Sequence, residues 1–326
     1  MRLFSRTTRT TRTGTRRATV AVVLAAALGL GACADPVNLT AVSETGLNLT
    51  PDQDRVRSEV NPEIAELVPE SISEDGLLTV GTLVHGAPPL VMTATDNTTQ
   101  IGSEIDLAQL LADKLGLELS LELTSWDNWA LKVEAGEFEA MHGNIAVTDA
   151  RLEKFDFTPY RAAYLGFIAQ AGSDLHIEQA EDISGLRIAA AAGTNQDRVL
   201  GEWNDQLIAE GKEPAEIYHY VNENDMTMAL VAGRLDAFFN HLPGASYLAN
   251  TRDDVEVAGR VSAGWPQETL VGTAMGRGSG LAPAVTAALN ELIDEGTYQE
   301  VLERWDLGDE ALDQTHTESL ESYGEN

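Results

Sequence analysis

Short apolar runs alternate with segments of helical period along most of this chain. The runs at 187–192, 217–221 and 235–239 have the composition of strands, and apolar residues at helical spacing occupy 199–208 and 226–232 between them. Regular alternation of strand and helix is typical of mostly parallel sheets that are covered by helices. The pattern therefore predicts an α/β fold.

The first part of the body and its C-terminal part follow the same rule. Residues 77–82 predict a strand, and apolar residues at 105–115 have helical spacing that stops at a glycine, where a helix cap is expected. Alternating leucines at 117–123 predict a strand with one buried face. Residues 281–305 predict a pair of helices that is broken at Gly296.

Glycine-containing linkers at 171–172 and 264–266 divide this body into two lobes. We expect lobe 1 at 76–170 and 268–308, and lobe 2 at 171–267. A chain that leaves one lobe, builds another and returns crosses between them twice. The sequence therefore predicts a two-strand hinge.

The N-terminal residues have the composition of a secretion signal. Residues 1–32 contain six arginines and no acid, and the apolar run at 18–30 is followed by Gly-Ala-Cys. This run is shorter than the roughly 20 residues that a membrane-spanning helix needs. We therefore expect a lipoprotein signal peptide at 1–32, lipidation of Cys33, and a flexible tether at 33–75. The alternative is a buried cysteine after an ordinary signal peptide.

The expected mature chain is strongly acidic. Removal of residues 1–32 takes the formal net charge from −31 to −37. A negative field of this size repels nucleic acid, so we expect no nucleic-acid partner, and we expect a monomer. Its length of about 290 residues suffices for two lobes of ordinary domain size. Residues 309–326 are polar and are expected to form a loose tail.

Several short motifs follow one another within residues 76–308. They are LLTVGT at 77–82, PP at 88–89, GSEIDL at 102–107, GNIAVTDAR at 143–151, FDFTPY at 155–160, AGRLDA at 232–237 and EGTYQ at 295–299. In this order the motifs resemble the bacterial extracellular solute-binding proteins of family 3, the lipoproteins that bind polar amino acids for ABC transporters. The resemblance implies a two-lobed fold of the type II periplasmic-binding-protein kind, in which each lobe is a mostly parallel sheet flanked by helices.

Arg151 is the first candidate for a ligand contact. A guanidinium group is planar, charged and forked, so it can hold a carboxylate through two parallel hydrogen bonds. The resemblance implies this role for Arg151 and a place in the same site for Asn144, Ala146 and Thr148. We expect the Thr148 side chain to cap the helix that carries the arginine. The alternative for Arg151 is a surface ion pair with the acid two residues before or after it.

Three further residues are candidate ligand contacts by resemblance. Thr194 and Asn195 follow a strand of small residues and open a helix, so they are expected to touch the carboxylate from lobe 2. The alternative is an ordinary helix cap. Trp126 matches a position where the family places an aromatic ring against the ligand, and its alternative is a core tryptophan beside Trp129.

Two acids that the resemblance leads us to expect are absent. Binders of α-amino acids commonly hold the ammonium group with an acid at the position of Asn240 or His241, and binders of basic amino acids add one at the position of Leu83. Asn240 and His241 remain candidate contacts, but a strongly cationic ligand side chain is disfavoured. His85, His142 and His241 lack metal-site spacing, so we interpret them as neutral, hydrogen-bonding histidines rather than a metal site or a pH switch.

These observations predict the substrate-binding component of an ABC importer. It would capture a small, amino-acid-like carboxylate outside the cytoplasm and present it to a membrane permease. Two alternatives share the fold: a sensor that reports to a membrane receptor, and a dehydratase acting on prephenate-like acids. The sequence has no GxSxG elbow, no metal triad and no phosphate loop, so we expect neither enzyme activity nor a cofactor.

Overall fold

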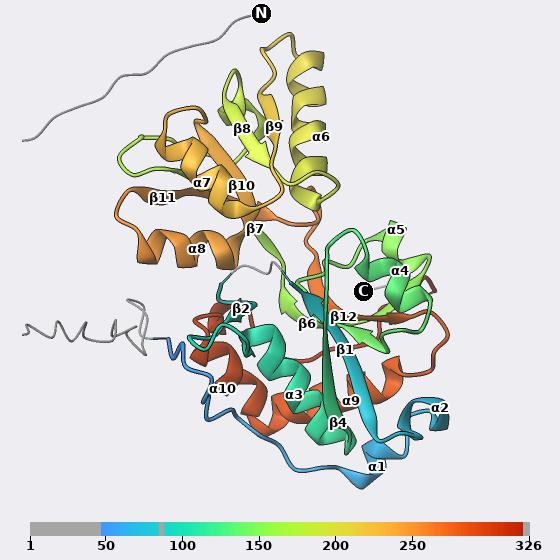
Figure 1. The fold of residues 1–326 in the computed structure, drawn as a ribbon. Coiled ribbons are helices and arrows are strands. Elements are labelled where there is room, and N and C mark those ends of the chain that lie inside the picture. Colours follow the sequence, from blue (N-terminus) through green and yellow to red (C-terminus); the bar gives the residue numbers. More distant parts are fainter. Residues whose placement is uncertain (1–46, 85–87, 322–326) are drawn as a thin grey trace, which may run out of the picture. The chain divides into compact units, whose positions relative to one another are not determined.

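The computed structural model describes residues 47–84 and 88–321, which all fall within one compact unit of the chain. Two five-stranded sheets form its framework, and helices flank each of them (Figure 1). The predicted α/β class with two lobes is confirmed. We call the parts built on the two sheets lobe 1 and lobe 2.

Lobe 1 contains the sheet with strand order β4-β1-β5-β12-β6. β4 (Glu118–Thr124), β1 (Leu77–Leu83) and β5 (Ala140–Met141) are parallel neighbours, whereas β12 (Leu270–Gly276) is antiparallel to both β5 and β6 (Phe155–Ala162). The other elements of this lobe are α1 (Pro62–Ala65), α2 (Glu70–Ser73), β2 (Met92–Thr93), β3 (Gln100–Ile101), α3 (Ser103–Leu115), α4 (Trp129–Glu134), α5 (Asp149–Leu152), α9 (Ala282–Glu295), α10 (Thr297–Arg304) and the 3-10 turn η2 (Gly308–Glu310).

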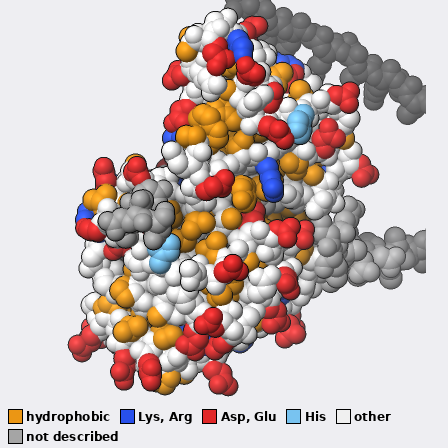
Figure 2. Space-filling model, turned by 180° about the vertical axis from the view of Figure 1, so that it is seen from behind, with side chains coloured by type: hydrophobic (Ala, Val, Ile, Leu, Met, Phe, Trp, Pro, Cys, Tyr) orange, Lys and Arg blue, Asp and Glu red, His pale blue; other side chains and the backbone are white. Residues whose placement is uncertain are grey.

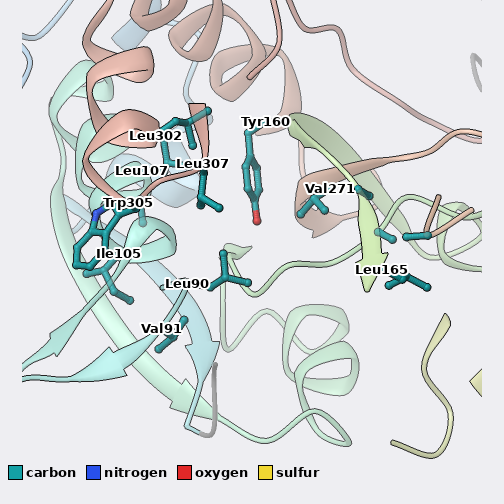
Figure 3. Packing of buried hydrophobic residues seen from close by; sticks show 14 of the residues in the cluster. Leu90, Val91, Ile105, Leu107, Tyr160, Leu165, Val271, Leu302, Trp305 and Leu307 are labelled. Atoms are coloured by element: carbon teal, nitrogen blue, oxygen red, sulfur yellow. The ribbon is translucent and has the colours of Figure 1, made fainter. Parts of the chain in front are cut away.

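The core of lobe 1 joins α3 to the C-terminal helices. Figure 3 shows Ile105 and Leu107 of α3 near Trp305, with Leu302 of α10 in the same cluster. Trp305 is 1% exposed, and its indole nitrogen donates a hydrogen bond to Asp106 at 2.8 Å. Because that polar group is satisfied, the ring is buried without the cost of an unpaired donor.

Lobe 2 contains the sheet with strand order β11-β7-β10-β8-β9. Its strands are β7 (Tyr164–Gln170), β8 (Arg187–Ala190), β9 (Glu216–His219), β10 (Ala237–His241) and β11 (Val255–Ser262), and its helices are η1 (Ala180–Ile183), α6 (Asn195–Ala209), α7 (Glu223–Val231) and α8 (Leu242–Thr251). The rings of Phe167 and Phe239 stack at 3.8 Å between centroids, and Trp203 of α6 lies 5.7 Å from Phe167. These rings join α6 to the sheet.

The elements predicted from periodicity are all present. They are β1, α3, β4, β8, α6, β9, α7, β10, α9 and α10. Gly116 ends α3 in the left-handed conformation with φ 72°, and Gly296 with φ 82° separates α9 from α10. Glycine adopts this backbone geometry without the steric penalty of a side chain, which explains why both helices end there.

Two features of the sheets differ from the prediction. In each sheet, two of the four neighbouring strand pairs are antiparallel, so the sheets are mixed rather than mostly parallel. The chain also changes sheet at Ala163, because β7 already pairs within lobe 2, although we placed the boundary after residue 170. The returning strand meets this crossing, since the amide of Ala263 donates to the carbonyl of Ala163 at 2.9 Å.

Two segments that we expected to be loose pack on lobe 1. In the region expected as tether, Arg57 forms an ion pair with Asp113 of α3 at 2.6 Å. In the expected tail, Glu318 pairs with Phe157 of β6, and the Thr315 hydroxyl donates to a backbone carbonyl at 2.6 Å. The signal peptide 1–32, Cys33, the first part of the tether and residues 322–326 lie outside the described residues, as does His85.

No helix within the described ranges combines the length and the apolar character that a membrane span requires. Figure 2 shows Asp and Glu side chains distributed over the visible face, with few Lys or Arg between them. This surface agrees with the low isoelectric point of the sequence, about 4.3. A surface of this charge favours solubility and disfavours polyanionic partners.

Candidate functional site

The motif at 143–151 forms a loop that is fixed to β12. The segment runs beside the start of that strand, because Ala146 and Val271 form an isolated antiparallel bridge and the amide of Val147 donates to Leu270 at 2.9 Å. α5 follows directly and carries Arg151. The position of the arginine is therefore set by a sheet strand rather than by a free loop.

Arg151 is a half-buried cation without a carboxylate partner. Its guanidinium donates to the Ala146 carbonyl at 2.6 Å and lies over the ring of Trp126, 5.4 Å from the centroid. Burial lowers the pKa of Arg151 to about 10, so the group stays charged at neutral pH. In residues 47–84 and 88–321, it forms no ion pair with an acid two residues away or with any other acid. The structure therefore gives no support to the surface ion pair that we considered.

Trp126 meets both of the interpretations that we gave for it. Its ring lies 6.3 Å from that of Trp129, at the edge of a small core cluster, and its other contact is the Arg151 guanidinium. A cation over an indole face is attracted electrostatically by the ring. Trp126 thus positions the arginine from the side.

Thr148 occupies the cap position of α5, but its side chain makes no capping hydrogen bond. The prediction that its hydroxyl caps the helix is wrong. The four-residue helix instead has amides of Arg151 and Leu152 that bond to the Thr148 backbone carbonyl, at 2.9 and 3.0 Å. The hydroxyl group is therefore not committed to the cap.

Asn144 is held by a buried network that the sequence did not reveal. Its side-chain oxygen accepts a hydrogen bond from Arg161 at 2.6 Å, and its backbone adopts the left-handed conformation with φ 56°. Arg161 is fully buried and pairs with Glu310 and, at 3.6 Å, with Glu104. Tyr160 donates to the same Glu104 carboxylate. This network fixes the start of the loop that leads to Arg151.

The charges of this network are strongly perturbed. Burial raises the pKa of Glu104, although Arg161 opposes the shift. Burial alone would lower the pKa of Arg161, but Glu310 and Glu104 outweigh that effect and raise it. His142 stacks on Tyr160 at 5.0 Å and lies in the core with 1% exposure, so it does not face a cleft. Its interpretation as a neutral, hydrogen-bonding histidine fits a pKa that burial lowers to about 3.

In lobe 2, Thr194 and Asn195 open α6. The Thr194 hydroxyl accepts from the Asp197 amide at 3.3 Å and donates to Ala191 at 2.7 Å, as an ordinary cap does. The Asn195 amide group donates to the Ala263 carbonyl at 2.9 Å, next to the hinge crossing. Both side chains therefore have structural partners in the same lobe, and their contact with a ligand stays a prediction.

Asn240 and His241 end β10 beside the start of α6. Gln196 reaches the Asn240 side-chain oxygen at 3.5 Å, which brings these two candidate segments together. His241 caps α8, because its Nδ1 accepts from the Gly244 amide at 3.0 Å. Burial and then the charge of Arg161 lower the pKa of His241 to about 3, so the ring is neutral. Arg161 also binds Asn144 of the loop that leads to Arg151. The same arginine therefore acts on both the lobe 1 loop and the end of β10.

Glu223 is a charged residue that sequence reasoning missed. It is the first residue of α7, and its carboxylate accepts a hydrogen bond from Asn240 at 2.5 Å. The two residues are 17 positions apart, and no local periodicity indicates that they meet. An acid therefore lies next to the position at which the sequence lacks one.

The structure has a cavity of about 230 Å³ next to the end of β10. It is lined by α8, by residues 305–310 and by side chains that include Tyr164 and Arg260. None of the predicted ligand contacts lines it, so we do not assign the ligand to it. In the described part of the chain, no group of three or more His, Cys, Asp or Glu side chains could hold a metal ion.

Comparison with known proteins agrees with this geometry. The model of the bacterial extracellular solute-binding proteins, family 3, matches residues 78–309. The chain belongs to this family. Arginine-binding protein ArgT of Corynebacterium glutamicum is 30% identical over 260 residues, which are 78% of this chain and 82% of that protein. L-cystine-binding protein TcyJ of Escherichia coli is 28% identical over 237 residues, 72% of this chain and 84% of that protein.

Solved structures of amino acid-binding proteins have a similar fold. An amino acid ABC transporter substrate-binding protein from Streptococcus pneumoniae, bound to L-arginine, has a TM-score of 0.63 and 28% identity, and covers 72% of this chain and 95% of its own. An ancestral amino acid-binding protein, described as a precursor of cyclohexadienyl dehydratase, has a TM-score of 0.62 and 25% identity over 72% of this chain and 98% of its own. The type II periplasmic-binding-protein fold is confirmed.

Proposed function

We propose that this protein is the substrate-binding component of an ABC importer and that it captures an amino-acid-like carboxylate outside the cytoplasm. Arg151 carries the proposal, because it is a half-buried guanidinium that no described acid neutralises. A cation withdrawn from water is favourable only if an anion meets it. A ligand carboxylate, held by two charge-assisted hydrogen bonds, would fill this role.

Several further residues would complete the site. Ala146 and Trp126 orient the arginine, Asn144 and Thr148 belong to the same loop, and lobe 2 would contribute Thr194, Asn195, Asn240 and His241. A ligand that touches both lobes would favour the closed arrangement, because it binds that arrangement more tightly than the open one. The protein would thus report occupancy to its permease through a conformational change.

The role as a binding protein agrees with the names of the relatives, which are binding proteins for arginine, cystine and other amino acids. We assign no catalytic group and no cofactor. We propose that the chain works as a monomer and is held at the membrane surface by lipid at Cys33, with the permease as its membrane partner.

The test of the site is the variant Arg151→Ala. A thermal-shift panel of amino acids, L-cystine and their deaminated acids first identifies a ligand, since binding raises the melting temperature by mass action. Calorimetry with that ligand should then show that Arg151→Ala binds it more weakly, with a binding free energy less favourable by about 2 to 5 kcal/mol. This is the range for a buried charge pair that loses one partner.

Arg277→Ala serves as the matched control. This arginine also lies in lobe 1, but it is exposed and pairs with Glu321 at 2.6 Å. Its replacement should leave the affinity unchanged. Equal affinities of the Arg151→Ala variant and the unmodified protein would remove Arg151 from the site, and a panel without any binding carboxylate would remove the proposed function.

A further inference from the structure

The C-terminal segment, which we define as residues 310–321, lies along the edge of the lobe 1 sheet. β6 is the last strand of that sheet and has β12 on one side. On its other side, the backbone groups of Phe157 and Glu318 exchange two hydrogen bonds of 2.8 Å, and the Thr315 hydroxyl donates to the Pro159 carbonyl at 2.6 Å. The segment therefore covers part of the edge of β6, where backbone groups would otherwise lack partners.

Helix α9 holds the C-terminal segment from a second side. Asn290 exchanges two hydrogen bonds of 2.9 Å with the backbone of Thr315, and the hydroxyl groups of Thr286 and Thr317 lie 2.9 Å apart. The family model matches residues 78–309, so it ends directly before this segment. These contacts therefore lie outside the part of the chain that the family model describes.

Glu310 begins the C-terminal segment and binds a buried charge. Its carboxylate accepts a hydrogen bond from Arg161, which is fully buried, and Glu310 itself is 7% exposed. The carboxylate of Glu104, the other acid near this arginine, lies 3.6 Å from the guanidinium, and burial raises the pKa of Glu104. Glu310 is therefore the closer counter-ion of Arg161, and its loss would leave a buried cation poorly compensated.

The Arg161 guanidinium joins the C-terminal segment to the loop that leads to Arg151. Its Nη1 donates to Glu310, and its Nη2 donates to the Asn144 side chain at 2.6 Å. A guanidinium is planar and rigid, so a contact that fixes one end also orients the other. Two residues after Asn144, the Ala146 carbonyl accepts a hydrogen bond from Arg151 at 2.6 Å. A continuous set of contacts therefore leads from Glu310 to Arg151.

We propose that Glu310 is a positioning residue for ligand binding, and that the C-terminal segment thereby sets the affinity of the Arg151 site without touching the ligand. The inference rests on the proposed function. Without the Glu310 charge, the Arg161 guanidinium would turn toward Glu104 and release the Asn144 side chain. The loop would then present Arg151 in more than one position, and a carboxylate that needs two parallel hydrogen bonds would be held less tightly.

The experiment measures the affinity of Glu310→Gln, which keeps the shape of the side chain and removes its charge. The probes are L-arginine, L-cystine and L-glutamine, and the one that binds most tightly to the unmodified protein is used in calorimetry with every variant. Glu310→Gln should bind this probe at least about fivefold more weakly, the lower end of the range for coupled sites. Glu310→Asp retains the charge and should bind the probe more tightly than Glu310→Gln does.

A double-mutant cycle separates positioning from a general loss of stability. Asn144→Ala removes the contact between Arg161 and the loop. In that background, Glu310→Gln should change the affinity by less than about twofold, because the two changes interrupt the same set of contacts. A purely structural effect of Glu310 would not depend on Asn144 and would appear in both backgrounds. If Glu310→Gln does not fold, the cycle is measured with Glu310→Asp, whose shorter side chain also weakens the contact with Arg161.

Glu321→Gln is the matched control within the same segment. Glu321 is 71% exposed and pairs with Arg277 on the surface at 2.6 Å. Its replacement removes the same charge from the C-terminal segment and should leave the affinity for the probe unchanged. An equal weakening in Glu321→Gln and Glu310→Gln would reveal an effect of net charge and would overturn the inference.

The remaining outcomes separate the inference from the function on which it rests. If Glu310→Gln binds the probe as tightly as the unmodified protein, or weakens binding equally with and without the Asn144 side chain, Glu310 does not position the loop and only the inference falls. If none of the probes binds to the unmodified protein, the inference falls as well. The proposed function falls with it only if the full panel of amino acids and deaminated acids also fails to bind.

Discussion

His142 gives the folded state a pH dependence whose size follows from its surroundings. The side chain is 1% exposed, its Nε2 lies 2.8 Å from the Thr273 hydroxyl, and its ring stacks on Tyr160. Burial lowers the pKa of His142 from 6.5 to about 3. The unfolded chain therefore takes up a proton near pH 6.5, whereas the folded protein does so only near pH 3.

The sign and the size of the effect follow from proton linkage. Between these two pKa values the unfolded state binds more protons than the folded state, so the free energy of unfolding falls as the pH falls. Each pH unit below 6.5 lowers the free energy of unfolding by about 1.4 kcal/mol. The free energy of unfolding is therefore about 3 kcal/mol lower at pH 4.5 than at pH 7. The full stability from this residue is present above pH 6.5, and the loss stops growing below pH 3.

Urea unfolding followed by circular dichroism at pH 7.0 and 4.5 measures this effect. Between pH 7.0 and 4.5, the free energy of unfolding of His142→Gln should fall by about 3 kcal/mol less than that of the unmodified protein. His241 and the acids remain in both proteins, so their contributions largely cancel in the difference. The principal coupling that does not cancel is with Glu104, whose carboxylate lies 3.8 Å from His142 Nδ1.

The control is His176→Gln, because the His176 side chain is 75% exposed and pairs with Glu178 on the surface. This variant should show the pH dependence of the unmodified protein. If His142→Gln loses as much stability between pH 7.0 and 4.5 as the unmodified protein does, the assignment of the proton uptake to His142 is wrong.

Two further variants test the fold and the anchor. Gly259→Ala should lower the urea midpoint by the equivalent of about 3 kcal/mol, because the added Cβ would lie 1.8 Å from the Ile177 carbonyl oxygen, whereas Gly201→Ala in α6 meets nothing within 4 Å and should stabilise by about 0.5 to 1 kcal/mol. An equal effect of both would contradict this packing. Cys33→Ala should move the protein from the membrane fraction to the soluble extracytoplasmic fraction, and an unchanged distribution would argue against lipidation at this residue.

Local patterns were sufficient to predict most helices and strands. α6 is an example, because Val199, Leu200, Trp203 and Leu207 share one helical face and all four are fully buried. Spacing alone carries this information, since one face of a helix must be apolar when it covers a sheet. The Arg151 loop was also predictable, because its family motif is continuous in sequence.

Features that depend on distant pairing were not predictable in this way. The apolar run of β7 has the same character in either sheet, so nothing in its composition indicates that the chain changes sheet at Ala163. The contact of Glu223 with Asn240 depends on how α7 is placed against β10. Burial of Arg161 likewise follows from acids that lie far from it in sequence, Glu104 and Glu310.

Arg161 explains why the structure singles out Arg151. The two are successive arginines along the chain, and only Arg151 lies within a motif of the family. Arg161 is fully buried but is neutralised by Glu104 and Glu310, so an added anion would face two carboxylates that already compete for it. Among the described residues, the Arg151 guanidinium instead contacts a backbone carbonyl and an indole ring. A carboxylate ligand therefore gains the most binding free energy at Arg151. Arg161 instead holds the loop in place through its hydrogen bond to Asn144.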